Sequence, residues 1–363
     1  MVYKQTVLSQ LFLISFVNII MRKIFYIYFF LLLLAGQSVR AQFDTQPSNY
    51  WAAPNYFNPG YAGQSGRLEL TGLYRMQWLG MENAPKSGII LGEMPLPLMG
   101  REHGVGVSMY NDQIGLFSTT LISGQFAFKM KLFGGSLGIG LQGGYITDKF
   151  DGTKIEPPTD DDGNPIDDPA IPTTLVEGKS IDAAFGIYYT DSLKRWYVGL
   201  SVTHLLSPTL VLSNNYEREI PRSYYFTAGC NIQLNNPLLE LRPSVLLKTT
   251  SMSSLYIDKD SLVVATEPNT LKGMLRQTQG DVSLRMVYNK MFWGGLSWRK
   301  GESMIIMLGG QFKIVEVGYA YDVPVFSSLI RTTSGSHELF IKYMMDMNFG
   351  KGSKSKRKSV RIL

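Results

Sequence analysis

Val-Glu-Val-Gly-Tyr-Ala-Tyr-Asp, residues 315–322, alternates strictly between large apolar side chains and small or charged ones. Val and Tyr fall on one side of the chain, and Glu, Gly, Ala and Asp fall on the other. A period of two residues is typical of a β-strand whose two faces meet different surroundings. This stretch therefore predicts a strand with one apolar face and one small or polar face.

The same alternation returns along the chain, clearly in residues 67–78, 125–130, 282–288 and 338–343. The strands that contain these segments are expected to have about ten residues each, the length that a tilted strand needs to cross a bilayer. No run of about 18 apolar residues follows position 42, so the sequence predicts no transmembrane helix. We count about fourteen strands, centred near residues 72, 91, 107, 123, 141, 185, 200, 227, 245, 284, 297, 307, 319 and 341.

The connections between these strands test a barrel topology. Bacterial outer-membrane barrels have short periplasmic turns, longer outer loops and both termini inside. Every second connection is predicted to be short, at residues 98–102, 131–134, 190–194, 234–238, 289–292 and 312–314. The long connections, 147–179, 205–221, 251–280 and 324–335, all fall on the opposite side. The sequence therefore predicts an all-β fold, a transmembrane antiparallel β-barrel with its long loops outside.

Composition agrees with a barrel, since the chain holds 36 Gly, 20 Tyr and 19 Phe, residues that suit aromatic girdles and closely spaced strands. A soluble β-sandwich is the competing fold, because its strands also carry one apolar face. Cys230 is the single cysteine, so no internal disulfide can form. Much of the formal net charge of +6 comes from the N-terminal region and from a basic stretch after position 350. This distribution does not indicate nucleic-acid binding.

The N-terminal region has the pattern of an export signal. Residues 21–23 (MRK) form a charged start, residues 24–35 an apolar core, and residues 39–41 (VRA) a cleavage site. We interpret Met21 as the true start, with an unusually long signal or an anchored N-terminus as the alternatives. The predicted regions are a signal region at 1–41, a periplasmic N-terminal segment at 42–66, the barrel at 67–349 and a basic disordered tail at 350–363.

Sequence motifs of catalysis are missing. The three histidines are far apart, and no zinc-protease, hydrolase, P-loop or dinucleotide motif occurs. The acidic stretch at 160–168 suggests calcium, but its spacing lacks the ligand pattern, so we favour a solvated outer loop. Gly138 and Gly140 are interpreted as strand glycines that relieve crowding in a curved sheet. We expect no enzyme activity, no cofactor and no metal.

Six short blocks, in this order, carry a resemblance to a known family. Residues 57–63 read FNPGYAG, 74–78 YRMQW, 241–244 LRPS, 293–299 WGGLSWR, 319–322 YAYD and 334–339 SGSHEL. Together they resemble the PorP/SprF family of outer-membrane barrels of the type IX secretion and gliding machinery of Bacteroidetes. The motif residues are Asn58, Pro59, Tyr61, Gly63, Tyr74, Arg75, Trp78, Arg242, Pro243, Trp298, Arg299, Tyr319, Tyr321, Asp322, Ser336, His337 and Glu338.

The motif residues have a structural or a partner-binding interpretation. The Asn-Pro-Gly sequence predicts a tight turn leading into the first strand. In that strand we expect Tyr74 and Trp78 to face lipid or the interface, while Arg75 and Gln77 point inward. Buried polar groups need partners. We therefore expect an inward hydrogen-bonded network made by Arg75, Asp322, His337 and Glu338.

The resemblance implies an exported, non-enzymatic outer-membrane component of type IX secretion. Its implied partners are the periplasmic PorK/PorN ring, a PorE-like cell-wall-binding protein and a SprB-like adhesin, besides outer-membrane lipid. A small-solute channel is the alternative function, and it would require an open lumen. The basic tail could contact an acidic partner or the anionic cell wall, although a solvated tail is the simpler interpretation.

Overall fold

The computed structural model of the chain describes residues 44–98, 100–155, 172–213, 216–251, 255–257, 264–266, 278–325 and 332–347. The predicted signal region, the acidic stretch at 160–168 and the basic tail at 350–363 lie outside the described residues.

Within the described residues, fourteen long strands build one sheet, and each contains one of the predicted centres, so the strand prediction is confirmed. The strands are β1 (Arg67–Met76), β2 (Lys86–Leu98), β3 (Arg101–Ile114), β4 (Phe117–Leu132), β5 (Gly135–Asp151), β6 (Leu175–Asp191), β7 (Trp196–Thr203), β10 (Ser223–Cys230), β12 (Leu239–Thr250), β15 (Gln279–Tyr288), β16 (Phe292–Arg299), β17 (Ser303–Phe312), β18 (Val315–Val323) and β19 (Ser336–Asp346).

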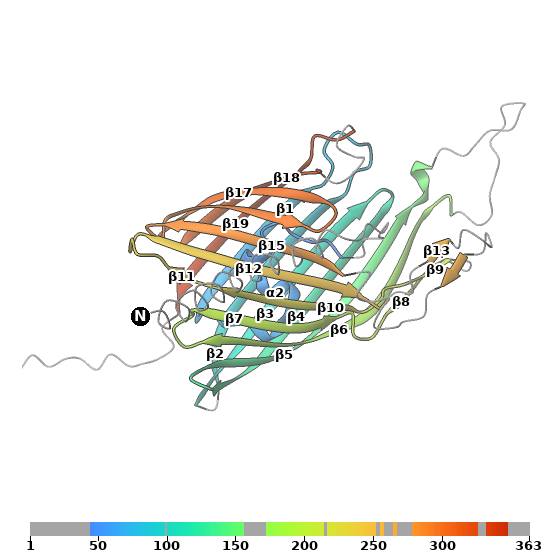
Figure 1. Cartoon of the computed structure of the whole chain (residues 1–363). Helices are drawn as coiled ribbons and strands as arrows, with labels where there is room; N and C mark the ends of the chain where they lie inside the picture. Colours follow the sequence, from blue (N-terminus) through green and yellow to red (C-terminus); the bar gives the residue numbers. More distant parts are fainter. Residues whose placement is uncertain are drawn as a thin grey trace, which may run out of the picture.

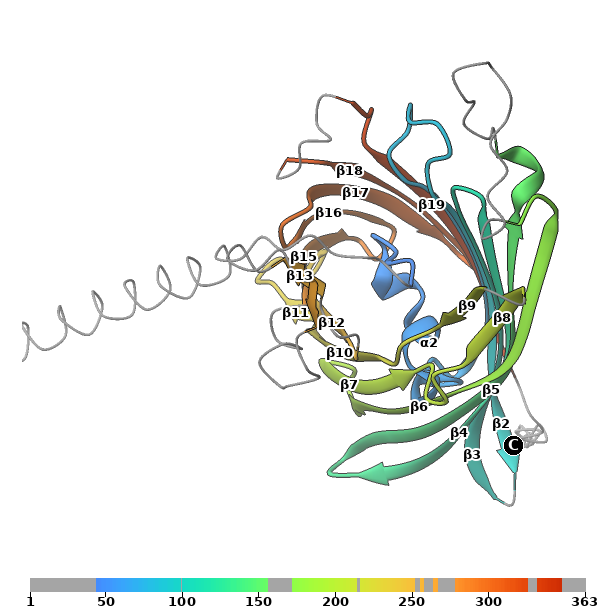
Figure 2. The ribbon, with the colours of Figure 1, turned by 90° about the vertical axis from the view of Figure 1, so that its right-hand side faces the viewer.

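The sheet closes into a barrel. Strands that follow one another in sequence pair antiparallel, β10 pairs with β12, and β1 pairs with β19 to complete the circle (Figures 1 and 2). Closure leaves no unpaired sheet edge, which is what a lipid environment requires. The described shorter strands are β11 (Ile232–Gln233), which pairs with β12 in the same sheet, and two separate pairs, β8 (Thr209–Ser213) with β9 (Tyr216–Glu219) and β13 (Leu255–Ile257) with β14 (Val264–Thr266).

One end of the barrel carries tight turns. Between β4 and β5, Phe133 and Gly134 have φ angles of 47° and 74°, the geometry of a two-residue hairpin turn. The long connections, such as those that follow Asp151 and Thr250, lie at the other end. The short-turn end is therefore the periplasmic end of such a barrel. No helix among the described residues is long and apolar enough to cross a membrane.

The outer surface of the barrel is apolar. Along β17 the outward residues Met304, Ile306 and Leu308 are 37%, 49% and 57% exposed, while the alternate side chains are mostly buried. Because period two puts neighbouring residues on opposite faces of a strand, one face meets lipid and the other meets the lumen.

Residues 44–66 lie inside the barrel, where Figure 2 shows them as the blue segment surrounded by strands. They form η1 (Tyr50–Ala52), α2 (Pro54–Phe57) and η2 (Pro59–Tyr61), and a further short turn, η3 (Gly152–Lys154), follows β5. The sequence predicted a periplasmic location for residues 42–66, and the structure corrects this for the part it describes. Trp51 helps to hold these residues inside the barrel, because its ring packs edge-on against Trp293 and Phe340 of the wall. We call residues 44–66 the lumenal plug.

Candidate functional site

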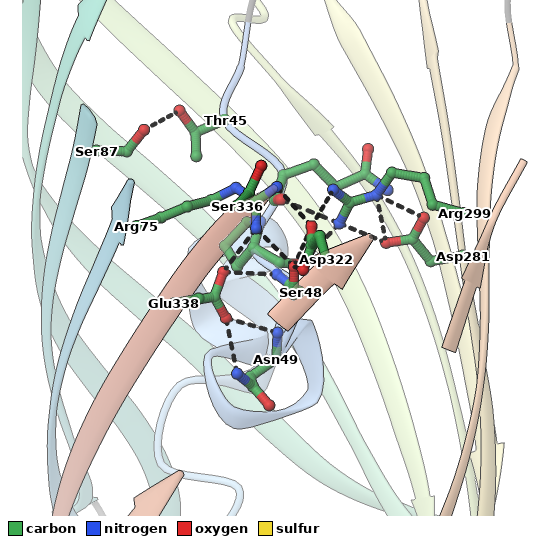
Figure 3. Close-up of polar contacts among 12 residues, drawn as sticks. Thr45, Ser48, Asn49, Arg75, Ser87, Asp281, Arg299, Asp322, Ser336 and Glu338 are labelled. Atoms are coloured by element: carbon green, nitrogen blue, oxygen red, sulfur yellow. Dashed lines mark hydrogen bonds and ion pairs between the residues drawn. The ribbon is translucent and has the colours of Figure 1, made fainter. Parts of the chain in front are cut away.

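The lumenal plug is held by a carboxylate of the last strand. The backbone N–H groups of Ser48 and Asn49 donate to the two oxygens of Glu338, each at 2.7 Å. The Asn49 side chain adds a third hydrogen bond at 2.9 Å. A buried carboxylate that accepts several N–H bonds is well satisfied, so Glu338 fixes the position of the plug backbone (Figure 3).

Arg75 of β1 joins the plug to two strands. Its guanidinium donates to the Ser48 hydroxyl at 2.6 Å and to Asp322 of β18 at 2.7 Å, and it lies 3.5 Å from Glu338. Ser48 in turn donates to Asp322 at 2.7 Å. These four residues are all 2% exposed or less. The predicted association of Arg75, Asp322 and Glu338 is therefore present, with the plug at its centre.

A second arginine extends the network across the lumen. Arg299 of β16 bonds Asp281 of β15 at 2.9 and 3.0 Å and lies 3.3 Å from Asp322. It also donates to the carbonyl of Gln46 in the plug at 3.2 Å. Two arginines thus alternate with carboxylates in a buried chain (Figure 3). We call Ser48, Asn49, Arg75, Asp281, Arg299, Asp322 and Glu338 the plug latch.

The start of the plug is fixed separately, near the end of β7. His204 bonds Asp44 at 2.9 Å and Asp182 at 2.7 Å, one through each ring nitrogen. Tyr225 donates to Asp44 at 2.7 Å, and Lys248 donates to the Asp44 carbonyl at 2.8 Å. Both nitrogens of a protonated histidine are donors, so two carboxylates favour the charged ring.

The electrostatic effects on Asp44 and His204 follow from this geometry. Burial opposes charge on His204, but Asp44 and the hydrogen bonds to both carboxylates outweigh it and raise the pKa of His204 to about 10. Burial likewise opposes charge on Asp44, but His204 and Lys248 outweigh it and hold the pKa of Asp44 well below its ordinary value. The arrangement is a buried ion pair. Within the described part of the chain, no group of His, Cys, Asp or Glu is arranged to hold a metal ion.

The Asn-Pro-Gly turn of the plug lies against glycines of the wall. Asn58 donates to the carbonyls of Ile187 and Leu200 at 2.9 and 3.2 Å, and it accepts from the N–H of Gly60 at 2.9 Å. A β-carbon on Gly140 would overlap the backbone of Pro59.

A β-carbon on Gly138 would overlap the backbone of Gly60 in the same way. We predicted that Gly138 and Gly140 relieve crowding in a curved sheet. The structure gives a different reason, because they make room for the plug.

The remaining plug motif residues lie closer to the short-turn end. Tyr61 meets the Tyr188 ring edge-on with the ring centroids 5.1 Å apart. Gly63 has a φ of 66° and donates its N–H to Glu93 at 3.1 Å. Positive φ explains the glycine at this position.

Other motif residues face away from the lumen. His337 lies on the outer face of β19, where its ring bonds the Tyr319 hydroxyl at 2.6 Å and contacts Tyr321. The expectation that His337 joins the inward network is wrong, because it is an odd number of residues from Ser336 and Glu338 and so points to the other face. Tyr74, 49% exposed, and the half-buried Trp298 are also outward.

The last motif residues stabilise strand ends or line the lumen. Trp78 follows β1 with a φ of 53°, and its N–H donates to the Ser336 hydroxyl at 3.1 Å. Arg242 of β12 bonds Glu240 at 3.0 Å, and Pro243 beside it is half-buried opposite Leu284.

Several residues of the plug latch and of the His204 site were missed by sequence reasoning. Ser48, Asn49 and Asp44 lie in a short segment without periodicity, and no sequence signal relates them to strands hundreds of residues away. Asp281 carried a usable signal, since it stands one residue before the alternation that starts at Val282, on the polar face.

Comparison with solved structures gives matches of low sequence identity. The CymD monoaromatic hydrocarbon channel is 12% identical with a TM-score of 0.41, covering 78% of this chain and 88% of that chain. The Pseudomonas putida toluene transporter TodX is 9% identical with a TM-score of 0.41, covering 81% and 93%. BamA from Haemophilus ducreyi lacking POTRA domains 1-3 is 10% identical with a TM-score of 0.39, covering 77% and 70%. A search of curated proteins found no match.

A family model gives a more direct result. The model described as "Type IX secretion system membrane protein PorP/SprF" matches residues 39–343, which includes the plug and nearly all of the barrel. The match spans well over half of the chain and agrees with the motif blocks, from the Asn-Pro-Gly turn to the Ser-His-Glu of β19. The chain therefore belongs to the PorP/SprF family of type IX secretion system membrane proteins.

Proposed function

We propose that this protein is a non-enzymatic outer-membrane anchor of the type IX secretion and gliding machinery, exported by a cleaved N-terminal signal. In this role it either holds periplasmic components, namely a PorK/PorN ring and a PorE-like cell-wall-binding protein, or supports export and display of one SprB-like adhesin. Membership of the family supports a role in type IX secretion. The fold offers two separate surfaces for contact with partners, the short turns and the long loops.

The observation that carries the anchor role is the occupied lumen. The plug is held by buried hydrogen bonds to β1, β16, β18 and β19, and ion pairs among Arg75, Arg299, Asp281 and Asp322 join these wall strands to one another and to β15. A barrel wall that is hydrogen-bonded to the plug through several strands resists deformation. A rigid barrel with a filled interior suits force transmission and partner docking better than solute flow.

Comparative proteomics of the cell surface and medium after deletion of the gene tests this proposal, in a strain without a second family member. Loss of many exported proteins assigns the protein to the core machinery, and loss of one adhesin assigns it to that cargo. An unchanged surface and medium would overturn the proposal.

Planar-bilayer recording of the purified barrel addresses the channel alternative. We expect little steady conductance, because the plug occupies the lumen. Stable open-channel currents from the wild-type protein would favour a small-solute channel instead.

A further inference from the structure

A cavity of about 420 Å³ lies between the plug and the short-turn end of the barrel. Its lining includes Arg67 at the start of β1, Lys194 in the turn before β7 and Met344 near the end of β19, all at that end. The cavity therefore opens toward the periplasm, while the plug lies across the lumen on its other side. We call it the periplasmic-mouth cavity.

The walls of the periplasmic-mouth cavity are aromatic and basic. The plug contributes aromatic rings, and β6 and β7 contribute more. Five cationic side chains, Arg67, Lys194, Arg242, Arg285 and Lys342, line the cavity against the two carboxylates of Glu69 and Glu316. Basic side chains beside flat rings favour an anionic ligand that also has apolar surface.

Arg285 is the unusual member of this wall. It is 6% exposed, and its guanidinium lies 3.3 Å from the centroid of the Trp51 ring. Its buried Nε has no hydrogen-bond partner, and it forms no ion pair with any residue that the structure describes. A buried, unpaired arginine is costly unless a ligand completes it. The Trp51 ring satisfies the face of the guanidinium and leaves its edge for an acceptor.

The strand register increases the need of Arg285 for an anionic partner. Arg285 of β15 stands directly opposite Arg242 of β12, and like charges in that position repel. Arg242 has a carboxylate partner, Glu240, at 3.0 Å, and Arg75 and Arg299 have carboxylate partners too. Arg285 has none among the residues that the structure describes. A carboxylate placed beside Arg285 would remove the repulsion and match the fork of the guanidinium.

We propose that the periplasmic-mouth cavity binds an acidic peptide segment presented from the periplasm, with one carboxylate paired to Arg285 and close to Arg242. The aromatic walls would cover the apolar parts of the segment. The ligand is external, because the residues after position 350 of this chain carry Lys and Arg and no acid. The inference deepens the proposed function and rests on it for the identity of the partner, but binding itself is measurable without the secretion machinery.

Fluorescence anisotropy with the full-length protein in detergent micelles tests the proposal. The probe is a short fluorescein-labelled peptide of Asp and Glu, compared with the same peptide in which every acid is Asn or Gln. We expect the acidic peptide to bind at least about tenfold more tightly than the amide peptide, and Arg285→Gln to weaken it by about tenfold or more. Arg101→Gln is the matched control, since Arg101 is exposed at the same end but outside the cavity, and it should change binding less than about twofold.

Folding of each variant is checked by heat-modifiable migration on gels, and Arg242→Gln provides a second variant if Arg285→Gln does not fold. Equal binding of the two peptides would overturn the proposal, as would unchanged binding by both folded variants. Arg285-dependent binding of inorganic phosphate without binding of the peptide would also overturn it. Peptide binding with a normal cell surface after gene deletion would retain this site while removing the secretion role.

Discussion

Gly140 and Pro59 are in backbone contact across the lumen, so close that a methyl group on Gly140 would overlap the Pro59 carbonyl. The contact joins the wall of β5 to the turn of the plug. Since backbone atoms cannot move aside as a flexible side chain does, the space is available to glycine alone.

Gly140→Ala should therefore displace the plug or strain β5. We expect a loss of about 1–3 kcal/mol in the free energy of unfolding, the usual cost of an overfilled site. Gly143→Ala is the matched control, because a β-carbon there meets no atom within 4 Å. Urea titration of both variants in lipid vesicles measures the difference. Equal stability of Gly140→Ala and the wild type would contradict the tight contact.

Arg75→Met should lower the free energy of unfolding by more than the small change in side-chain volume would suggest. It leaves Glu338 without its arginine and removes one of the partners of Asp322, and a broken buried ion pair costs about 3–5 kcal/mol. Arg67→Met on the same strand removes a pair with Asp346 that is 46% and 78% exposed, so we expect about 0–1 kcal/mol. Unfolding by urea again gives both values, and similar losses in the two variants would refute a structural role for the plug latch.

The barrel was predictable because its information is local. Many strands repeat the same two-residue alternation, and hairpin connections fix each neighbour, so β18 could be recognised from eight residues alone. Arg75 and Asp322 were also predictable, since each stands on the polar face of a clear strand.

The plug was not predictable from the same rules. Ser48 meets Glu338 at a separation of 290 residues, and nothing periodic surrounds it. A short segment without periodicity carries no local sign of the surface it packs against, even where it holds aromatic residues such as Trp51. The predicted periplasmic location was wrong for residues 44–66 for this reason.

The pair of His204 and Asp44 should make stability depend on pH. The pKa of His204 is about 10 in the folded protein against an ordinary 6.5, so its contribution is complete below about pH 6.5. Between these values the folded state holds a proton that the unfolded state has lost, and stability falls by up to about 1.4 kcal/mol per pH unit.

Thermal melts of the wild type and His204→Gln across this pH range measure the effect, and the difference between them should shrink as pH rises through 10. His337→Gln is the control, since His337 bonds Tyr319 rather than a carboxylate. A difference that is constant with pH would show that His204 is not held in its charged form.

Leu296→Arg tests whether the apolar outer face lies in lipid. Leu296 is in the middle of β16, 57% exposed, between Leu284 and Ile306 on the neighbouring strands. On a soluble protein an exposed arginine there would be nearly neutral, whereas at the bilayer midplane it costs about 2–4 kcal/mol. Leu193→Arg, at a 71% exposed position in the turn between β6 and β7, should cost about 0–1 kcal/mol because it lies near the interface. Folding of both variants into lipid vesicles, followed by urea titration, separates the two cases, since equal effects would place Leu296 in water and favour a soluble barrel.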